Sequence, residues 1–268
     1  MKNKLMKILA LATVCVMVFA LTACGKKGDT LLVVTEATFP PFDTVDDDGN
    51  IIGFDMDLIT EIANDQGFKI EFKDIGFDSL IPALEAKEAD IIAAGMNSLD
   101  PERQAKVDFS TPYFDSYLVL VVKEGNTTIN GVGDLTSSMK VAGQIGTTGA
   151  DEATALETEG KIAKAVILDK VSDAMLQLQN GDIDAIILDK PVTDAYLAKQ
   201  PGVAKIVGDA IGEKEAYAFA VQKGNTELLD KINKCLQNMK DNGLIKDFYA
   251  SQSTSVEEMI AAIEDYIN

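Results

Sequence analysis

One arginine stands out among the side chains that could bind a ligand. The chain has 24 lysine and arginine residues in total, and Arg103 is its only arginine. A planar guanidinium can hold a carboxylate by two parallel N–H bonds, which a lysine ammonium cannot imitate. We therefore expect Arg103 to bind an anionic group. The alternative is a surface arginine at the start of a helix.

Two further segments carry polar groups of the right kind. The loop from Gly146 to Gly149 precedes an expected helix, and free backbone N–H groups at a helix start attract anions. Thr147 and Thr148 would add donors there, unless this is an ordinary turn. Asp189 follows an apolar strand, so its carboxylate is expected at a strand end facing a cleft. Its alternative role is to cap the helix that follows.

Composition excludes several classes of chemistry. The chain has no histidine and no tryptophan, so a Ser-His-Asp triad, a histidine base and a histidine-based zinc site are absent. We expect no metal and no cofactor, and we do not expect an enzyme. The net charge of −19 argues against a nucleic-acid partner, which requires a basic surface. It mildly favours cationic or neutral ligands, although a solvated acidic surface explains it equally well.

The first residues have the pattern of a secretory signal. Lys2, Lys4 and Lys7 precede an apolar run over 8–20, which is shorter than a bilayer-spanning helix requires. A permanent anchor helix is the alternative. The sequence "LTAC" at 21–24 resembles a bacterial lipobox, which implies removal of residues 1–23 and acyl chains on Cys24. Residues 24–30 are then a tether, and the protein is extracytoplasmic and lipid-anchored to the membrane.

Strand and helix patterns alternate along the rest of the chain, which indicates an α/β fold with parallel sheets. A helical apolar face begins at Phe54, and Gly67 is expected to end that helix. Asp78 is expected to cap one helix, and Asp100 with Pro101 to begin another. Cys235 lies in a helical apolar pattern and is expected to be a buried thiol.

Two segments resemble each other: "SYLVLVVKEGNTTI" from Ser116 and "EAYAFAVQKGNTEL" from Glu215. Each is an apolar strand with a tyrosine, followed by Lys, Gly, Asn and Thr. If they are neighbours, the chain leaves one lobe, builds a second and returns through a two-stranded hinge. Two unrelated edge strands are the alternative.

Eight blocks of the chain resemble the solute-binding proteins of polar amino-acid ABC transporters, the bacterial extracellular solute-binding family 3. In order they are "TEATFPPF", "GFDMDL", "IPAL", "DIIAAGM", "DPERQAKVDFSTPY", "GQIGTTG", "GDIDAIILDKP" and "GLIKDFY". The resemblance implies two α/β lobes with mainly parallel sheets, joined by two hinge strands, that close on a ligand. It places lobe 1 at 31–119 plus 219–250, lobe 2 at 120–218 and a helical tail at 251–268.

The resemblance also implies roles for particular residues. Arg103 binds the carboxylate of a free amino acid, with Thr147 and Thr148 from the other lobe, while Asp189 and the Gly95 carbonyl accept from its ammonium group.

The ligand side chain would lie between the rings of Phe39 and Phe54, whereas Phe42 and Phe77 are expected in the core. Glu36 would contact the far end of that side chain and favour Arg, Lys, His or an amide; otherwise it is a surface residue at a strand end.

Two features depart from the family pattern. Eight residues instead of seven lead from Gly95 to Arg103, and Asn97 replaces the usual Thr or Ser. Ser98 supplies the missing hydroxyl if the loop bulges. These departures bear on the ammonium contact and on the class of ligand.

The leading hypothesis is a monomeric, lipid-anchored protein that captures a polar, possibly basic, amino acid and delivers it to an ABC permease. One alternative is an extracytoplasmic enzyme on the same scaffold, such as a dehydratase, with Glu36 as its acid or base. The other is a sensor subunit that reports a ligand to a receptor.

Overall fold

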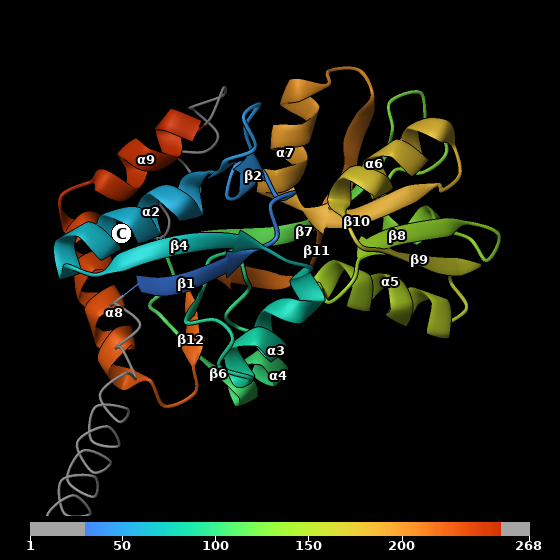
Figure 1. Cartoon of the computed structure of the whole chain (residues 1–268). Coiled ribbons are helices and arrows are strands. Elements are labelled where there is room, and N and C mark those ends of the chain that lie inside the picture. The colour runs from blue at the N-terminus through green and yellow to red at the C-terminus, as the bar shows by residue number, and fades with distance from the viewer. Residues whose placement is uncertain (1–29, 253–268) are drawn as a thin grey trace, which may run out of the picture. The chain divides into compact units, whose positions relative to one another are not determined.

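The structure is a computed structural model that describes residues 30–252, and within them the strands form two five-stranded sheets and one two-stranded pair (Figure 1). Residues 31–252 belong to one compact unit. The first sheet has the order β4 (Lys69–Asp74), β1 (Thr30–Thr35), β5 (Ile91–Ile92), β12 (Ala220–Gln222) and β6 (Val107–Phe109). The two-stranded pair is β2 (Thr44–Val45) with β3 (Ile51–Ile52).

The second sheet has the order β11 (Ala204–Tyr217), β7 (Phe114–Lys123), β10 (Ala185–Asp189), β8 (Lys140–Gln144) and β9 (Lys164–Leu168). The helices associated with the first sheet are α2 (Phe54–Gln66), η1 (Phe77–Ser79), α3 (Leu80–Glu85), α4 (Pro101–Lys106), α8 (Thr226–Asp241) and α9 (Leu244–Gln252). Those of the second are η2 (Val132–Asp134), α5 (Thr148–Thr158), α6 (Val171–Asn180) and α7 (Lys190–Lys199).

Both sheets contain parallel and antiparallel pairs, and the expected α/β fold is confirmed. In the first sheet β1 and β5 are parallel, whereas β12 is antiparallel to β5 and to β6. In the second sheet β8 is parallel to β9 and β10, whereas β7 is antiparallel to β10 and β11. Helical crossovers produce the parallel pairs. The antiparallel pairs involve β7, β11 and β12. These strands lie within or directly next to the two segments that resemble each other in sequence.

The two segments meet at their first residues, as the hinge hypothesis requires, while residues 220–222 of the second segment pair with β5 and β6 of the first sheet. β7 pairs with β11 in a register that places Ser116 opposite Glu215 and Phe114 opposite Tyr217. The chain therefore passes twice through the same place, once before and once after it builds the core of the second sheet. The exact lobe boundaries given above stay a prediction.

Local sequence signals explain several helix ends. Gly67 has a φ of 71° and ends α2 in the left-handed conformation that glycine adopts without strain. Asp100 accepts hydrogen bonds from the backbone N–H groups of Glu102 and Arg103, and Pro101 occupies the first turn, as expected. The prediction for Asp78 was wrong, because this residue lies inside the short helix η1, and Ser79 precedes α3.

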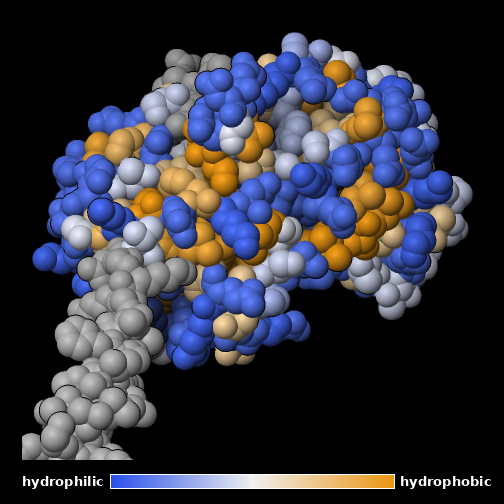
Figure 2. All heavy atoms as spheres, in the orientation of Figure 1, coloured by the Kyte–Doolittle hydropathy of each residue, from blue (hydrophilic) through white to orange (hydrophobic). Residues whose placement is uncertain are grey.

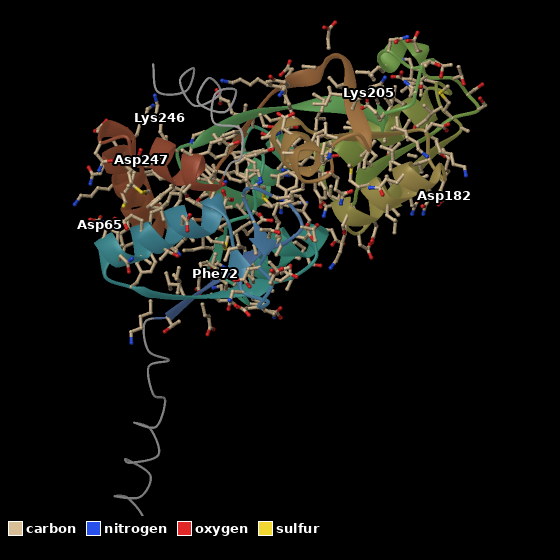
Figure 3. All side chains as sticks on the ribbon, turned by 90° about the horizontal axis from the view of Figure 1, so that it is seen from above. Asp65, Phe72, Asp182, Lys205, Lys246 and Asp247 are labelled. Carbon is tan, nitrogen blue, oxygen red and sulfur yellow. The ribbon has the colours of Figure 1, made fainter. Side chains whose placement is uncertain are left out.

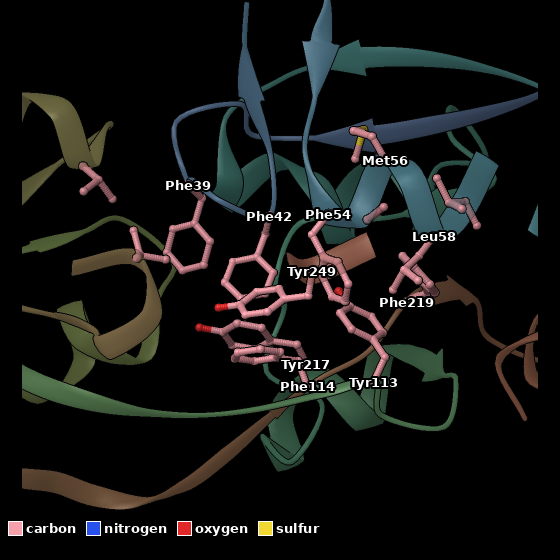
Figure 4. Close-up of a cluster of buried hydrophobic side chains, with 14 of the residues drawn as sticks. Phe39, Phe42, Phe54, Met56, Leu58, Tyr113, Phe114, Tyr217, Phe219 and Tyr249 are labelled. Atoms are coloured by element: carbon pink, nitrogen blue, oxygen red, sulfur yellow. The ribbon is translucent and has the colours of Figure 1, made fainter. Parts of the chain in front are cut away.

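The largest core cluster contains a group of aromatic rings between the first sheet's helices and the hinge strands (Figure 4). Phe42 lies 4.9 Å from Phe114 and 4.9 Å from Tyr217, measured between ring centroids. Phe54 lies 5.0 Å from Tyr249, and both rings are buried. Such edge-to-face pairs are favourable beyond the area that they bury. The same cluster includes Cys235, which is buried as expected and unpaired.

The surface is mostly polar. On the face drawn in Figure 2, hydrophilic residues predominate and apolar residues gather in a few patches. Charged side chains project from both sheet regions: Figure 3 shows Asp65 on α2 and Lys246 on α9 on one side of the view, with Asp182 and Lys205 on the other. Among residues 30–252, no helix has the length and apolar character needed to cross a membrane.

Several expectations fall outside the described residues. The signal peptide over 1–23, the acyl-carrying Cys24, the tether up to residue 29 and the tail from 253 to 268 all lie there. They stay predictions.

We expect Phe54→Ala to lower the free energy of unfolding by about 3–5 kcal/mol, the usual cost of truncating a buried phenylalanine. The ring is fully buried against four other aromatic rings. Urea unfolding measures this change. Tyr117→Ala, which removes a ring that is 40% exposed, is the control and should cost much less. Equal losses in the two variants would contradict the packing described.

Candidate functional site

Arg103 joins the first sheet's helix α4 to a loop of the second sheet. Its side chain is only 8% exposed. Nη1 donates to the carbonyl of Asn97 (3.3 Å) and Nη2 to the carbonyl of Gly146 (3.0 Å), while Nε lies 3.8 Å from Asp100. Arg103 is thus a buried cation held between elements far apart in sequence, and the interpretation as a mere surface residue is wrong.

The loop that receives Arg103 is shaped by glycine and threonine. Gly146 has a φ of 76°, and a β-carbon there would lie 3.1 Å from the α-carbon of Asp78 in η1. Glycine therefore permits a close approach between the two sheet regions. Thr147 caps α5, since its hydroxyl accepts from the Ala150 N–H (3.3 Å) and donates to the Gln144 carbonyl (2.7 Å). Thr148 begins the helix and lines a pocket together with Glu215.

Asp189 ends strand β10, as expected, and is 5% exposed. It precedes α7, but its side chain does not cap that helix. Its carboxylate instead accepts from the hydroxyls of Tyr217 and Ser116, the latter at 3.2 Å. Burial raises the pKa of Asp189, while the bonds from Tyr217, Glu215 and Ser116 oppose that rise. Asp189 is thus a buried, well-bonded carboxylate.

Glu36 is 3% exposed, so the interpretation as a surface residue is wrong. Thr38 donates to both of its oxygens at 2.9 Å, and the amide of Gln144 donates to Oε2 at 2.8 Å. Burial raises the pKa of Glu36, and the bonds from Gln144 and Thr38 oppose the rise. The contact with Gln144 links β1 of the first sheet to β8 of the second.

The aromatic residues are distributed differently from the expectation. Phe39 packs on Gly95, where a β-carbon would lie 2.8 Å from the ring, so glycine is required for this contact. Phe54 lies in the aromatic core and faces Tyr113 and Tyr249 (Figure 4). The structure does not pair Phe54 with Phe39 among its ring contacts, and a ligand role for Phe54 stays a prediction.

Phe77 lies at the edge of the core, since it packs against the cluster that includes Leu80 and Leu84. The residue is half-buried, and the guanidinium carbon of Arg103 lies 5.5 Å from its ring centroid. This is a cation–π distance. Phe77 was missed because its neighbours form a helical pattern, in which an aromatic residue usually faces the core.

The enlarged loop after Gly95 contacts the hinge. Asn97 Oδ1 accepts from the backbone N–H groups of Leu99 (3.0 Å) and Ala216 (3.3 Å). The Ser98 hydroxyl donates to the Ala216 carbonyl (2.8 Å). Both side chains therefore bind β11 in this structure. The backbone carbonyl of Asn97, by contrast, binds Arg103.

Three pockets lie around these residues. One of about 270 Å³ is lined by Phe77, Arg103, Gly146 and Asp151. A second of about 630 Å³ is lined by Asn97, Asp100, Thr148, Asp151 and Glu215. A third of about 340 Å³ is lined by Glu36, Asp74, Asp78, Asp169 and Lys170 among others. The third pocket has several carboxylates and one lysine, which favours a cationic group. Among the described residues, no cluster of three His, Cys, Asp or Glu side chains could hold a metal ion.

The site also contains residues that sequence reasoning missed, namely Gln144, Ser116, Glu215 and Tyr217. The sequence held a clue to two of these four residues. Glu215 and Tyr217 are two positions apart in a strand, so they point to the same face, and the hinge hypothesis places that face beside Asp189. Gln144 and Ser116 carry no comparable signal.

The sequence and the fold of this chain are similar to those of known proteins. Residues 31–251 match the bacterial extracellular solute-binding proteins, family 3. A relative from Escherichia coli K12, described as a putative ABC transporter arginine-binding protein 2, is 34% identical over 86% of this chain and 93% of its own length.

Solved structures agree. An ancestral arginine-binding protein bound to arginine is 41% identical, with a TM-score of 0.78, over 84% of this chain and 98% of that one. The ancestral amino acid-binding protein AncCDT-1, described as a precursor of cyclohexadienyl dehydratase, is 36% identical, with a TM-score of 0.76, over 84% and 95%. These neighbours share the two-lobed fold, with two mixed α/β sheets. The chain therefore belongs to the bacterial extracellular solute-binding proteins of family 3, and its relatives include amino-acid-binding proteins of ABC transporters.

Proposed function

We propose that this protein captures a basic amino acid between its two lobes and delivers it to an ABC permease without chemical change. The observation that carries the proposal is the placement of Arg103, a buried cation within reach of the helix start at Thr148. A free amino acid presents a carboxylate and an ammonium group, and both need partners in a dry site. Arg103 and Thr148 suit the carboxylate, while Asp189 suits the ammonium group.

The class of ligand is inferred from the residues around Glu36, which would contact the far end of the ligand side chain. Glu36 is buried beside Gln144, and its pocket is also lined by Asp74, Asp78 and Asp169. A guanidinium or ammonium group would neutralise part of this negative charge, whereas a neutral side chain would leave it unpaired. The arginine-binding descriptions of the relatives support the same choice.

A dehydratase-like enzyme is the second candidate, because one similar structure is a precursor of such an enzyme. Glu36 is a buried carboxyl with a raised pKa, which is the property that a general acid needs. The binding function is favoured because Glu36 is held by three hydrogen bonds in a fixed arrangement.

The proposal is tested by thermal unfolding of the protein with each common amino acid. A ligand at 100 times its dissociation constant adds about 2.7 kcal/mol to the free energy of unfolding, which is readily measured. We expect arginine or lysine to stabilise the protein. Arg103→Ala should lose about 2–5 kcal/mol of binding free energy, since it removes one half of a buried charge pair. If no amino acid stabilises the unmodified protein, or if Arg103→Ala binds normally, the proposed binding mode is wrong.

Glu36→Gln should weaken the binding of arginine more than that of glutamine, because only the cationic ligand loses a charge partner. Calorimetric titration with both ligands gives the two affinities. Glu88→Gln, at an exposed position that lines none of the three pockets, is the matched control for the loss of one negative charge. Equal weakening of both ligands would place Glu36 outside the side-chain pocket.

Lipid anchoring is a separate proposal that is supported by the "LTAC" sequence. We expect Cys24→Ser to move the protein from the membrane fraction into the soluble extracytoplasmic fraction and to abolish labelling by a fatty acid. Cys15→Ser, which changes the other cysteine of the N-terminal region, should leave both unchanged. A Cys24→Ser protein that still takes up the fatty acid would contradict the anchor.

A further inference from the structure

Two carboxyl groups lie together where the hinge strands meet β10. Asp189 ends β10 opposite Leu118 of β7, and Glu215 of β11 lies opposite Ser116 of β7. Both acidic residues are 5% exposed. The Ser116 hydroxyl donates to Asp189 at 3.2 Å, and Glu215 lies opposite Ser116 across the β7–β11 pair and two residues before Tyr217, whose hydroxyl also donates to Asp189. Glu215 and Thr148, at the start of α5, line the same pocket. Glu215 thus lies where the hinge strands, Asp189 and the start of α5 come together.

Two buried carboxylates in contact cannot both be ionised without a large cost in electrostatic repulsion and lost hydration. Asp189 accepts hydrogen bonds from Tyr217 and Ser116, so its ionised form is the better supported of the two. A protonated Glu215 can donate the remaining bond to Asp189. The pKa of Glu215 is raised to about 8, mainly because the group is buried and secondly because of the charge of Asp189. The pair therefore holds one proton at neutral pH.

Other charged groups near Glu215 act against one another. Arg103 of α4 lowers the pKa of Glu215. The second pocket is also lined by the acidic residues Asp100, Glu102, Asp151, Glu152 and Glu213 and by Lys214. Lys214 forms an ion pair with Asp115 at 2.8 Å and is largely exposed. Arg103 is thus the one cation that acts on Glu215 among the causes of its shifted pKa.

We propose that Glu215 is a positioning residue that, as a carboxylic acid, holds the Asp189 carboxylate in place for a ligand ammonium group and releases its proton to solvent as that group binds. The inference rests on the proposed amino-acid site, since the ammonium group is the cation concerned. No bond other than the O–H bond of Glu215 is broken, and the proton passes to water or buffer. An incoming positive charge stabilises the ionised form of a neighbouring carboxyl, which is the cause of the release.

The direction of the pH effect follows. Because a bound ammonium lowers the pKa of Glu215 from about 8, affinity rises with pH below that value. Release of one proton permits a change of at most about tenfold in affinity for each pH unit. In the ligand-free protein, folding stability has the opposite dependence on pH to that of ligand affinity. The folded state keeps a proton that the unfolded chain loses above pH 4.5, so stability falls as pH rises from there to about 8.

The test compares the purified full-length protein with Glu215→Gln, which keeps a donor for Asp189 but cannot titrate. Calorimetric titration with arginine at pH 7, in buffers with different ionisation enthalpies, counts the protons released for each ligand bound. We expect release of a proton by the unmodified protein and by the Glu88→Gln control, and none by Glu215→Gln. Glu215→Asp, which restores a carboxyl, should recover part of the release. Equal release with and without Glu215 overturns the proposal, as does no release by the unmodified protein.

Two further measurements can be made on the ligand-free protein. Thermal unfolding of the ligand-free unmodified protein from pH 5 to 9 should show a loss of stability that is smaller in Glu215→Gln and unchanged in Glu88→Gln, since the buried carboxyls Asp43 and Asp55, whose pKa values burial also raises, contribute to the loss in all three proteins. The infrared spectrum of the unmodified protein at pH 7 should show a protonated carboxyl component that is missing from Glu215→Gln and is lost when arginine binds, whereas the contribution of Asp43, whose pKa burial raises, is common to both proteins. If no amino acid binds, the proposed function fails while the ligand-free band and pH profile still decide whether the proton is held. If arginine binds and Glu215→Gln shows the same protonated carboxyl band as the unmodified protein, only the role of Glu215 is wrong.

Discussion

The antiparallel pairing of β7 with β11 is the constraint on which the site depends. It brings Ser116 opposite Glu215 and places Tyr217 on the same strand, so that hydroxyls from both hinge strands reach Asp189 at the end of β10. The loop after Gly95 is held by the same strand, through Asn97, Ser98 and the backbone of Ala216. Elements more than 100 residues apart thereby meet at one place.

Charge balance explains why these groups can be buried. Arg103 is a buried cation whose N–H groups are bound by backbone carbonyls and whose charge lies near acidic side chains. On the other side, Glu36 and Asp189 are buried carboxylates supplied with hydroxyl and amide donors. Buried charge without such partners is costly. The arrangement leaves room for a ligand that carries both signs of charge, as a free amino acid does.

Sequence reasoning succeeded where the signal is local. Asp100 and Pro101 begin α4 and Gly67 ends α2, since these depend on backbone geometry within one turn. It did not distinguish Phe54 from Phe77, because each lies between a glycine and an aspartate in the sequence. Phe54 is enclosed by rings from β7 and α9, whereas Phe77 faces Arg103, and only the packing of distant segments decides between these surroundings.

The sequence by itself determined the alternation of strands and helices, the choice of Arg103 and Asp189 as candidate partners for charged groups, and the relation between the two hinge segments. Residue type, periodicity and internal likeness are written in the chain and need no contacts. Only the tertiary structure decided that both sheets are mixed, that Glu36 is buried against Gln144, and that Glu215 and Asp189 are both buried beside Ser116. The physical reason is that strand direction, burial and the pKa of a carboxyl depend on which distant segments pack together.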